Sequence, residues 1–184
     1  MENFKTLADL KKEFIPAKNK NVYIDKITNN LYLGERPGGL QFDYFKDEGI
    51  TNVISLIGKF SPESPEYNEE TGIRRKIIEC EDFYTFNIIQ YFVECIEYIE
   101  KANKTYVHCL MGVSRSASIV IAYLMWKTHS NFHDVYEYVK EKREWVSPND
   151  GFVKQLSMFG EILEKNNYDL NKCGGDVKNV KWDG

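Results

Sequence analysis

Hydrophobic positions along this chain follow two patterns that alternate through most of its length. Short apolar runs bounded by turn residues predict strands at Val22–Ile27, Leu31–Leu33, Thr51–Ile57, Lys76–Cys80 and Thr105–His108. Apolar residues at helical spacing predict helices around residues 40–48, 88–99, 117–125, 135–139 and 152–163. Strands that alternate with helices are typical of an α/β domain, so we predict a central sheet flanked by helices, the last four of which pack as a group.

Cap and turn residues suggest where these elements end. Gly49 can close the helix at residues 40–48. Ser147 can cap a helix that has Pro148 in its first turn, so we expect the last core helix to begin there. Residues 58–73 are polar and rich in Glu and Pro, which predicts a long surface loop.

The two ends of the chain differ in composition from its middle. Residues 1–21 predict a short amphipathic helix from Phe4 to Phe14, followed by a polar linker. This helix could pack on the domain or contact another chain. The polar, Gly-bearing residues 166–184 predict a flexible C-terminal tail. We therefore expect one main domain over residues 22–165.

Composition limits the classes of function. The 184 residues, 42% of them hydrophobic, suit one folded domain, and the net charge of −4 provides no basic field for nucleic acid or an anionic membrane. The N-terminus has no apolar core of a signal peptide, and no apolar run approaches the roughly 18 residues that cross a bilayer. We expect cytoplasmic residence, with entry into the nucleus left open. The oligomeric state is open as well.

The four cysteines are spaced in a way that favours free thiols. No C-x-x-C pair or other cluster of metal-ligating residues appears, so we expect no metal and no cofactor. Cys80 and Cys95 are typical of small buried hydrophobic residues. Cys109 differs because it follows a predicted strand and opens a tight segment that leads into a buried helix.

That segment, Cys109-Leu110-Met111-Gly112-Val113-Ser114-Arg115, carries the chemistry. A loop that wraps before a helix N-terminus turns several unpaired backbone N–H groups into its concavity, and with the helix dipole they form an anion site. The same field favours the thiolate of Cys109, which is the nucleophilic form. The planar fork of Arg115 can hold two phosphate oxygens. These features predict covalent phosphoryl transfer.

The same residues carry a family resemblance. HCLMGVSRS at residues 108–116 resembles the signature of the cysteine-based protein tyrosine phosphatase superfamily, and ASIVIAYLM after it resembles the dual-specificity branch. VKEKREWVSPNDGF at 139–152 is similar to the small atypical members, and NLYLG at 30–34 and GITNVISL at 49–56 to the early strands. The resemblance covers roughly residues 22–165. It implies a protein tyrosine phosphatase-like α/β fold with a mixed sheet.

The resemblance also implies roles for single residues. Cys109 is the nucleophile, residues 110–115 bind the phosphate, and Ser116 stabilises the departing thiolate. Asp82 falls on the family's general-acid position, which its neighbours Glu79 and Glu81 do not. The implied activity is metal-independent hydrolysis of phosphotyrosine and of phosphoserine or phosphothreonine through a phosphocysteine. Partners would be phosphorylated proteins, with kinases among the candidates.

Two other functions are compatible with the loop. A non-catalytic phosphopeptide-binding module would keep the anion site, but such relatives usually alter the nucleophile or the acid. A phosphatase of lipid, RNA or glycan phosphates would often carry basic residues within the loop, where this chain has Leu110, Met111 and Val113.

Several neighbouring residues are also ambiguous. Phe83, Tyr84 and Phe86 could be core residues or the wall of a substrate cleft. We expect His108 to orient the loop by hydrogen bonding rather than to act as a base. Arg143 belongs to a basic run that predicts an exposed helix face, where it could pair with an acidic neighbour.

Overall fold

A mixed β-sheet forms the centre of the molecule. The computed structural model describes residues 5–13, 23–36, 39–59 and 72–184, and in this part the sheet has five strands in the order β1-β2-β5-β3-β4. Strand β1 is antiparallel to β2, and the other neighbours are parallel. The strands are β1 (Ile24–Lys26), β2 (Leu31–Gly34), β3 (Asn52–Ile57), β4 (Arg74–Glu79) and β5 (Thr105–His108). The predicted α/β class and mixed sheet are confirmed.

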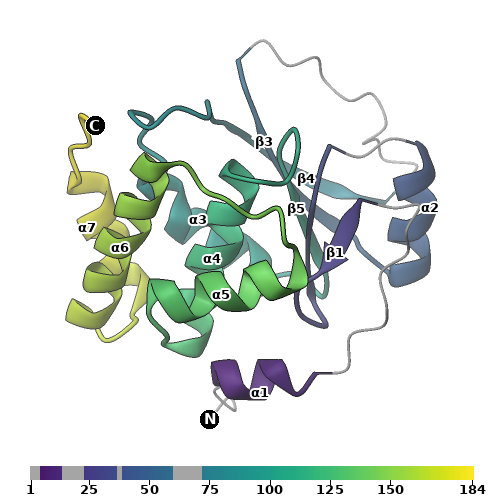
Figure 1. Cartoon of the computed structure of the whole chain (residues 1–184), viewed down its shortest axis with the longest axis horizontal. Helices are drawn as coiled ribbons and strands as arrows, with labels where there is room; N and C mark the ends of the chain where they lie inside the picture. Colours follow the sequence, from purple (N-terminus) through teal and green to yellow (C-terminus); the bar gives the residue numbers. More distant parts are fainter. Residues whose placement is uncertain (1–4, 14–22, 37–38, 60–71) are drawn as a thin grey trace.

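Helices cover both faces of this sheet (Figure 1). Helices α3 to α7 gather on one face, and α2 lies on the other side. The helices are α1 (Leu7–Lys11), α2 (Gly39–Glu48), η2 (a 3-10 turn, Ile89–Tyr91), α3 (Phe92–Glu100), α4 (Arg115–Thr128), α5 (Phe132–Lys142), α6 (Asp150–Lys165) and α7 (Leu170–Asn179). The prediction that the later helices pack as a group is confirmed, and Gly49, with φ +71°, follows α2 as expected.

The strands alternate their side chains between two cores. In β5, Tyr106 points into the small core beneath α2, whereas Val107 points into the large core beneath α3 to α7. In β3, Val53 and Ile54 divide in the same way. This alternation follows from the two-residue period of a strand. Because β5 has a core on each face, it is buried on both sides and fixes the start of the loop that follows it.

Helix α4 is buried along almost its whole length. Its residues 116–125 are all less than 9% exposed, because it lies against β5 and β2 on one side and against α3, α5 and α6 on the others. A helix enclosed in this way must be apolar all round, which explains the sequence pattern at 117–125. The loop before α4 is therefore fixed at both ends by buried elements.

Two predictions about the C-terminal third are wrong. The expected flexible tail contains helix α7, in which Cys173 and Val177 are buried against the large core. Helix α6 begins at Asp150, not at Ser147-Pro148, because the side chain of Asn149 caps it by accepting from Phe152 N–H. The Ser147 N–H instead donates to the Val113 carbonyl at 2.9 Å.

The N-terminal helix packs on the domain. Thr6 and Asp9 form a capping box at the start of α1, and Leu10 is 3% exposed within the large core. The predicted linker and the acidic part of the predicted surface loop lie outside the described residues. None of the helices in the described ranges combines the length and apolar character needed to cross a bilayer.

Candidate active site

The segment from Cys109 to Arg115 forms a tight loop between the end of β5 and the start of α4. Gly112 has φ +66°, and a Cβ on it would lie 2.3 Å from the Gly34 carbonyl oxygen at the end of β2. Only glycine fits this close approach and this backbone conformation. The loop is thereby pressed against β2 as well as held by β5.

Successive carbonyl groups of this loop all face outward. Leu110 O accepts from Arg36 N–H at 3.1 Å, and Val113 O accepts from Ser147 N–H at 2.9 Å. Between them, Met111 O and Gly112 O accept from the side chain of Arg143, each at 2.8 Å. In a trans peptide the N–H points away from the C=O, so the N–H groups of residues 111–114 face the inside of the loop. This arrangement is a backbone anion site.

The Cys109 thiol lies at the bottom of the loop and is 2% exposed. Its Sγ accepts from Gly112 N–H and from the hydroxyl of the buried Ser116, each at 3.2 Å. Burial opposes the thiolate, but hydrogen bonds from Ser116, the charge of Arg115 and a bond from Val113 N–H together lower the pKa of the Cys109 thiol below its usual value. The thiol of Cys80 has a pKa raised by burial, so the two cysteines differ in reactivity.

Arg115 begins α4 and keeps one donor available for a ligand. Its Nη1 donates to the Cys80 carbonyl at 3.2 Å, and its Nε lies 3.6 Å from Asp82 Oδ2. Nε is also buried without a hydrogen-bond partner within the described part of the chain. A buried donor of this kind is costly unless a ligand accepts from it, which fits an anion in the loop.

Asp82 lies on the β4–η2 loop (residues 80–88), next to Arg115. Asp82 Oδ1 accepts from the Ser114 hydroxyl at 2.6 Å and from Asn149 Nδ2 at 2.9 Å. Ser114 Oγ also accepts from Asn149 N–H at 3.1 Å. Glu81 is directed elsewhere, since its Oε1 accepts from Lys59 N–H at 2.8 Å. The structure thus brings Asp82 to the loop.

His108, the last residue of β5, holds the loop from behind. Its Nε2 is 2.7 Å from Ser55 Oγ, and its Nδ1 is 3.1 Å from the Cys109 carbonyl. Burial lowers the pKa of His108 to about 4, so the ring is neutral in the neutral pH range. The expected hydrogen-bonding role of His108 is confirmed.

Two residues of the site escaped the sequence analysis. Arg143 is not on an exposed helix face, because its side chain is 5% exposed, pairs with the buried Asp25 at 2.6 Å and binds two loop carbonyls. Asn149 joins the β4–η2 loop to the start of α6. Asn149 belongs to the segment in which the sequence predicts a helix start, so a capping role could have indicated it. For Arg143 the sequence pattern indicated only that it could pair with an acidic neighbour.

The aromatic residues near Asp82 lie mostly at the surface. Phe83 and Tyr84 are each 63% exposed, while Phe86 is half-buried and packs against the large core. In the cysteine loop, Leu110 and Met111 are 62% and 64% exposed. A small pocket at Cys109 and Arg115 is lined by the apolar side chains of Leu56, Ile57 and Leu110, and by Arg36. Among the described residues, no group of His, Cys, Asp and Glu is arranged to hold a metal ion.

Comparisons with known proteins show the family of this chain. Residues 31–162 match the family described as dual specificity phosphatase, catalytic domain. The chain belongs to the dual specificity phosphatase family. It is therefore a member of the cysteine-based protein tyrosine phosphatase superfamily, and the resemblance found in the sequence is confirmed.

Individual relatives show how far the likeness extends. The chain is 35% identical over 143 residues to human dual specificity protein phosphatase 9, covering 75% of this chain but 36% of that relative. It is 32% identical to dual specificity protein phosphatase 1B of Arabidopsis thaliana, covering 78% of this chain and 85% of the relative. The solved structure of DUSP15 superposes with a TM-score of 0.69 at 28% identity, covering 88% of this chain and 98% of that one.

Proposed function

We propose that this chain hydrolyses phosphate monoesters on tyrosine and on serine or threonine of phosphorylated proteins, through a phosphocysteine at Cys109. The observation that carries the proposal is the environment of the Cys109 sulfur. It receives two hydrogen bonds at the bottom of a loop whose N–H groups converge, beside Arg115 Nε, which has an ion pair with Asp82 but no hydrogen bond within the described residues. This arrangement favours both a thiolate and a bound phosphate dianion.

In the first step the Cys109 thiolate attacks phosphorus. The S–P bond forms while the bond from phosphorus to the substrate oxygen breaks, and Asp82 gives its proton to that oxygen. Because Asp82 Oδ1 already accepts two hydrogen bonds, we assign the proton to Oδ2, which is directed toward Arg115. Arg115 and the loop N–H groups bind the phosphoryl oxygens as negative charge is redistributed.

In the second step water attacks the phosphocysteine. Asp82, now a carboxylate, takes a proton from the water as the P–O bond forms and the S–P bond breaks. The sulfur leaves as a thiolate, which the Ser116 hydroxyl stabilises at 3.2 Å. Inorganic phosphate is released and the starting state is restored. No step uses a metal ion.

The exposed apolar side chains next to the catalytic residues in the sequence support a protein substrate over a phosphoinositide. Phe83, Tyr84, Leu110, Met111 and Trp145 are each more than 60% exposed. Phe83 and Tyr84 follow Asp82 in the sequence, and Leu110 and Met111 follow Cys109. Apolar and aromatic side chains can pack against residues on either side of a phosphorylated side chain. A highly charged headgroup would require additional cations instead.

Hydrolysis of para-nitrophenyl phosphate tests the mechanism. We expect wild-type turnover in EDTA and reductant, no turnover for Cys109→Ser, and a loss of about 100-fold or more in kcat for Asp82→Asn. A folded but inactive wild type would overturn the proposal and indicate a phosphopeptide-binding module. A panel of phosphotyrosine and phosphothreonine peptides, including segments of phosphorylated kinases, beside a phosphoinositide then tests the substrate class. Faster hydrolysis of the phosphoinositide would contradict the protein assignment.

A further inference from the structure

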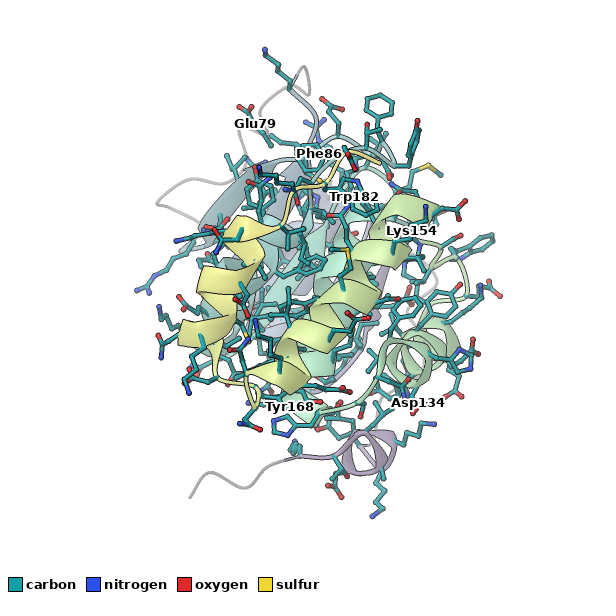
Figure 2. All side chains as sticks on the ribbon, turned by 90° about the vertical axis from the view of Figure 1, so that its left-hand side faces the viewer. Glu79, Phe86, Asp134, Lys154, Tyr168 and Trp182 are labelled. Carbon is teal, nitrogen blue, oxygen red and sulfur yellow. The ribbon has the colours of Figure 1, made fainter. Side chains whose placement is uncertain are left out.

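The last residues of the chain lie against the loop that carries Asp82. Helix α7 runs back alongside α6, and after it the chain crosses the upper end of the helical layer, where Figure 2 shows Trp182 and Phe86 at the same end of the molecule. The indole Nε1 of Trp182 donates to the Tyr84 carbonyl at 2.8 Å, and Asn87 Nδ2 donates to the Val180 carbonyl at 3.3 Å. We call residues 180–184 the C-terminal strap.

The strap starts from a fixed point. Helix α7 is anchored in the large core by Cys173 and Val177, which are 0% and 1% exposed. The helix packs against α6 and α3, so its end cannot move freely relative to the domain. The strap therefore connects a rigid part of the fold to the β4–η2 loop.

The side chains of the β4–η2 loop do little to hold the loop in place near Tyr84. Phe83 and Tyr84 are both 63% exposed, so neither anchors the loop by burial. The Tyr84 backbone is held on one side by the first turn of α6, where a Cβ on Gly151 would lie 2.0 Å from the Tyr84 carbonyl oxygen. The Trp182 hydrogen bond to that same oxygen is the contact that the strap adds at the Tyr84 peptide, and the Val180 carbonyl accepts from Asn87 further along the loop.

We propose that Trp182 is a positioning residue for the reaction, acting through Asp82. By fixing the Tyr84 peptide two residues from Asp82, it keeps the carboxyl group within reach of the leaving oxygen. Small displacements of an acid reduce proton transfer sharply, because the transfer requires hydrogen-bond contact. The inference rests on the proposed function. The family match ends at residue 162, so the strap lies beyond it.

The test compares two phosphate esters that differ in their need for an acid. Phenyl phosphate has a poor leaving group that must be protonated, whereas dinitrophenyl phosphate has one that leaves as an anion. Trp182→Phe keeps an aromatic ring and removes the N–H donor. We expect kcat/KM to fall about three- to tenfold on phenyl phosphate, the effect of one hydrogen bond, and to stay unchanged on dinitrophenyl phosphate.

The chain offers a matched control. Trp126 Nε1 donates to the Tyr168 carbonyl at 3.0 Å, and Figure 2 shows Tyr168 at the opposite end of α6 from Trp182. Trp126→Phe removes the same type of hydrogen bond far from Asp82. We expect it to leave both esters unaffected.

A second measurement separates positioning from general destabilisation. In an Asp82→Asn background, Trp182→Phe should have no further effect on phenyl phosphate, because the group through which it acts is gone. Equal losses on both esters, no loss on phenyl phosphate, a loss with Trp126→Phe, or a loss that persists without Asp82 would each overturn the proposal. Turnover of dinitrophenyl phosphate by wild type, and its absence in Cys109→Ser, tests the proposed function independently.

Discussion

Replacement of Arg143 by methionine is the sharpest test of how the cysteine loop is held. The side chains of Arg143 and Asp25 are 5% and 4% exposed and lie 2.6 Å apart. Arg143→Met leaves the Asp25 carboxylate buried without this cation. Removal of one partner from a buried ion pair lowers the free energy of unfolding by about 3–5 kcal/mol. Since small domains have about 5–15 kcal/mol of stability in total, we expect a large loss in the free energy of unfolding.

The variant should also lose activity, for a separate reason. The Met111 and Gly112 carbonyls lose the donors that turn them outward, so the N–H groups on the inside of the loop are no longer held. We expect kcat/KM on para-nitrophenyl phosphate to fall by about tenfold, less than the roughly 100-fold or more for removal of an oxyanion donor, because the N–H groups remain but are no longer held in place. Denaturant unfolding and steady-state kinetics measure the two effects, and Lys154→Met, an exposed change on α6, is the control.

A double variant separates the two effects. Asp25→Leu together with Arg143→Met removes both buried charges, and apolar replacement of a whole buried pair is often neutral or stabilising. Stability should therefore return, whereas kcat/KM should stay low because the loop carbonyls still lack their donors. A loss below about 1 kcal/mol in Arg143→Met, or full recovery of kcat/KM in the double variant, would refute this reasoning.

Other residues of the site lead to three further predictions. Ser116→Ala should raise the pKa of the Cys109 thiol, because a hydrogen bond to the thiolate is lost; the pH midpoint of iodoacetamide alkylation measures this, and an unchanged midpoint would contradict it. The pKa of His108 is depressed in the folded state to about 4, so its contribution to stability is present above the unfolded value near 6.5 and is lost as the pH falls. The unfolding free energy should drop by about 2 kcal/mol between about pH 7.5 and pH 5, and His108→Gln should lack that part of the drop. Gly112→Ala should abolish most activity, because its Cβ would lie 2.3 Å from a backbone oxygen, whereas Gly175→Ala, which has open space, should be as active as wild type.

Much of the fold and the centre of the site could be predicted because their signals are contiguous in the sequence. The strands and helices show their periodicities within windows of a few residues. Cys109, Arg115 and Ser116 stand within eight positions of one another, so strand, loop and helix together specify their arrangement. The loop chemistry followed from this local order.

The missed features depend on contacts between distant segments. Arg143 stands among lysines and has the local pattern of a surface residue, yet its partner Asp25 is 118 positions away. The apolar residues of α7, Leu170, Cys173 and Val177, do follow helical spacing, but the polar and glycine residues between them obscure the pattern. Helix α7 is stable because of the surface on which it packs, which composition does not reveal.

The position of β5 in the sheet has a consequence for synthesis of the protein. Strands β1 to β4 are made first, and in the finished sheet they form two pairs, β1 with β2 and β3 with β4, that only β5 connects. Until residue 105 leaves the ribosome, the inner edges of both pairs lack their partner strand. The strand that joins them ends one residue before Cys109, so completion of the sheet also brings Cys109 to the end of the sheet where its loop forms. A nascent chain that stops short of β5 is therefore both unprotected against aggregation and without the reactive thiol.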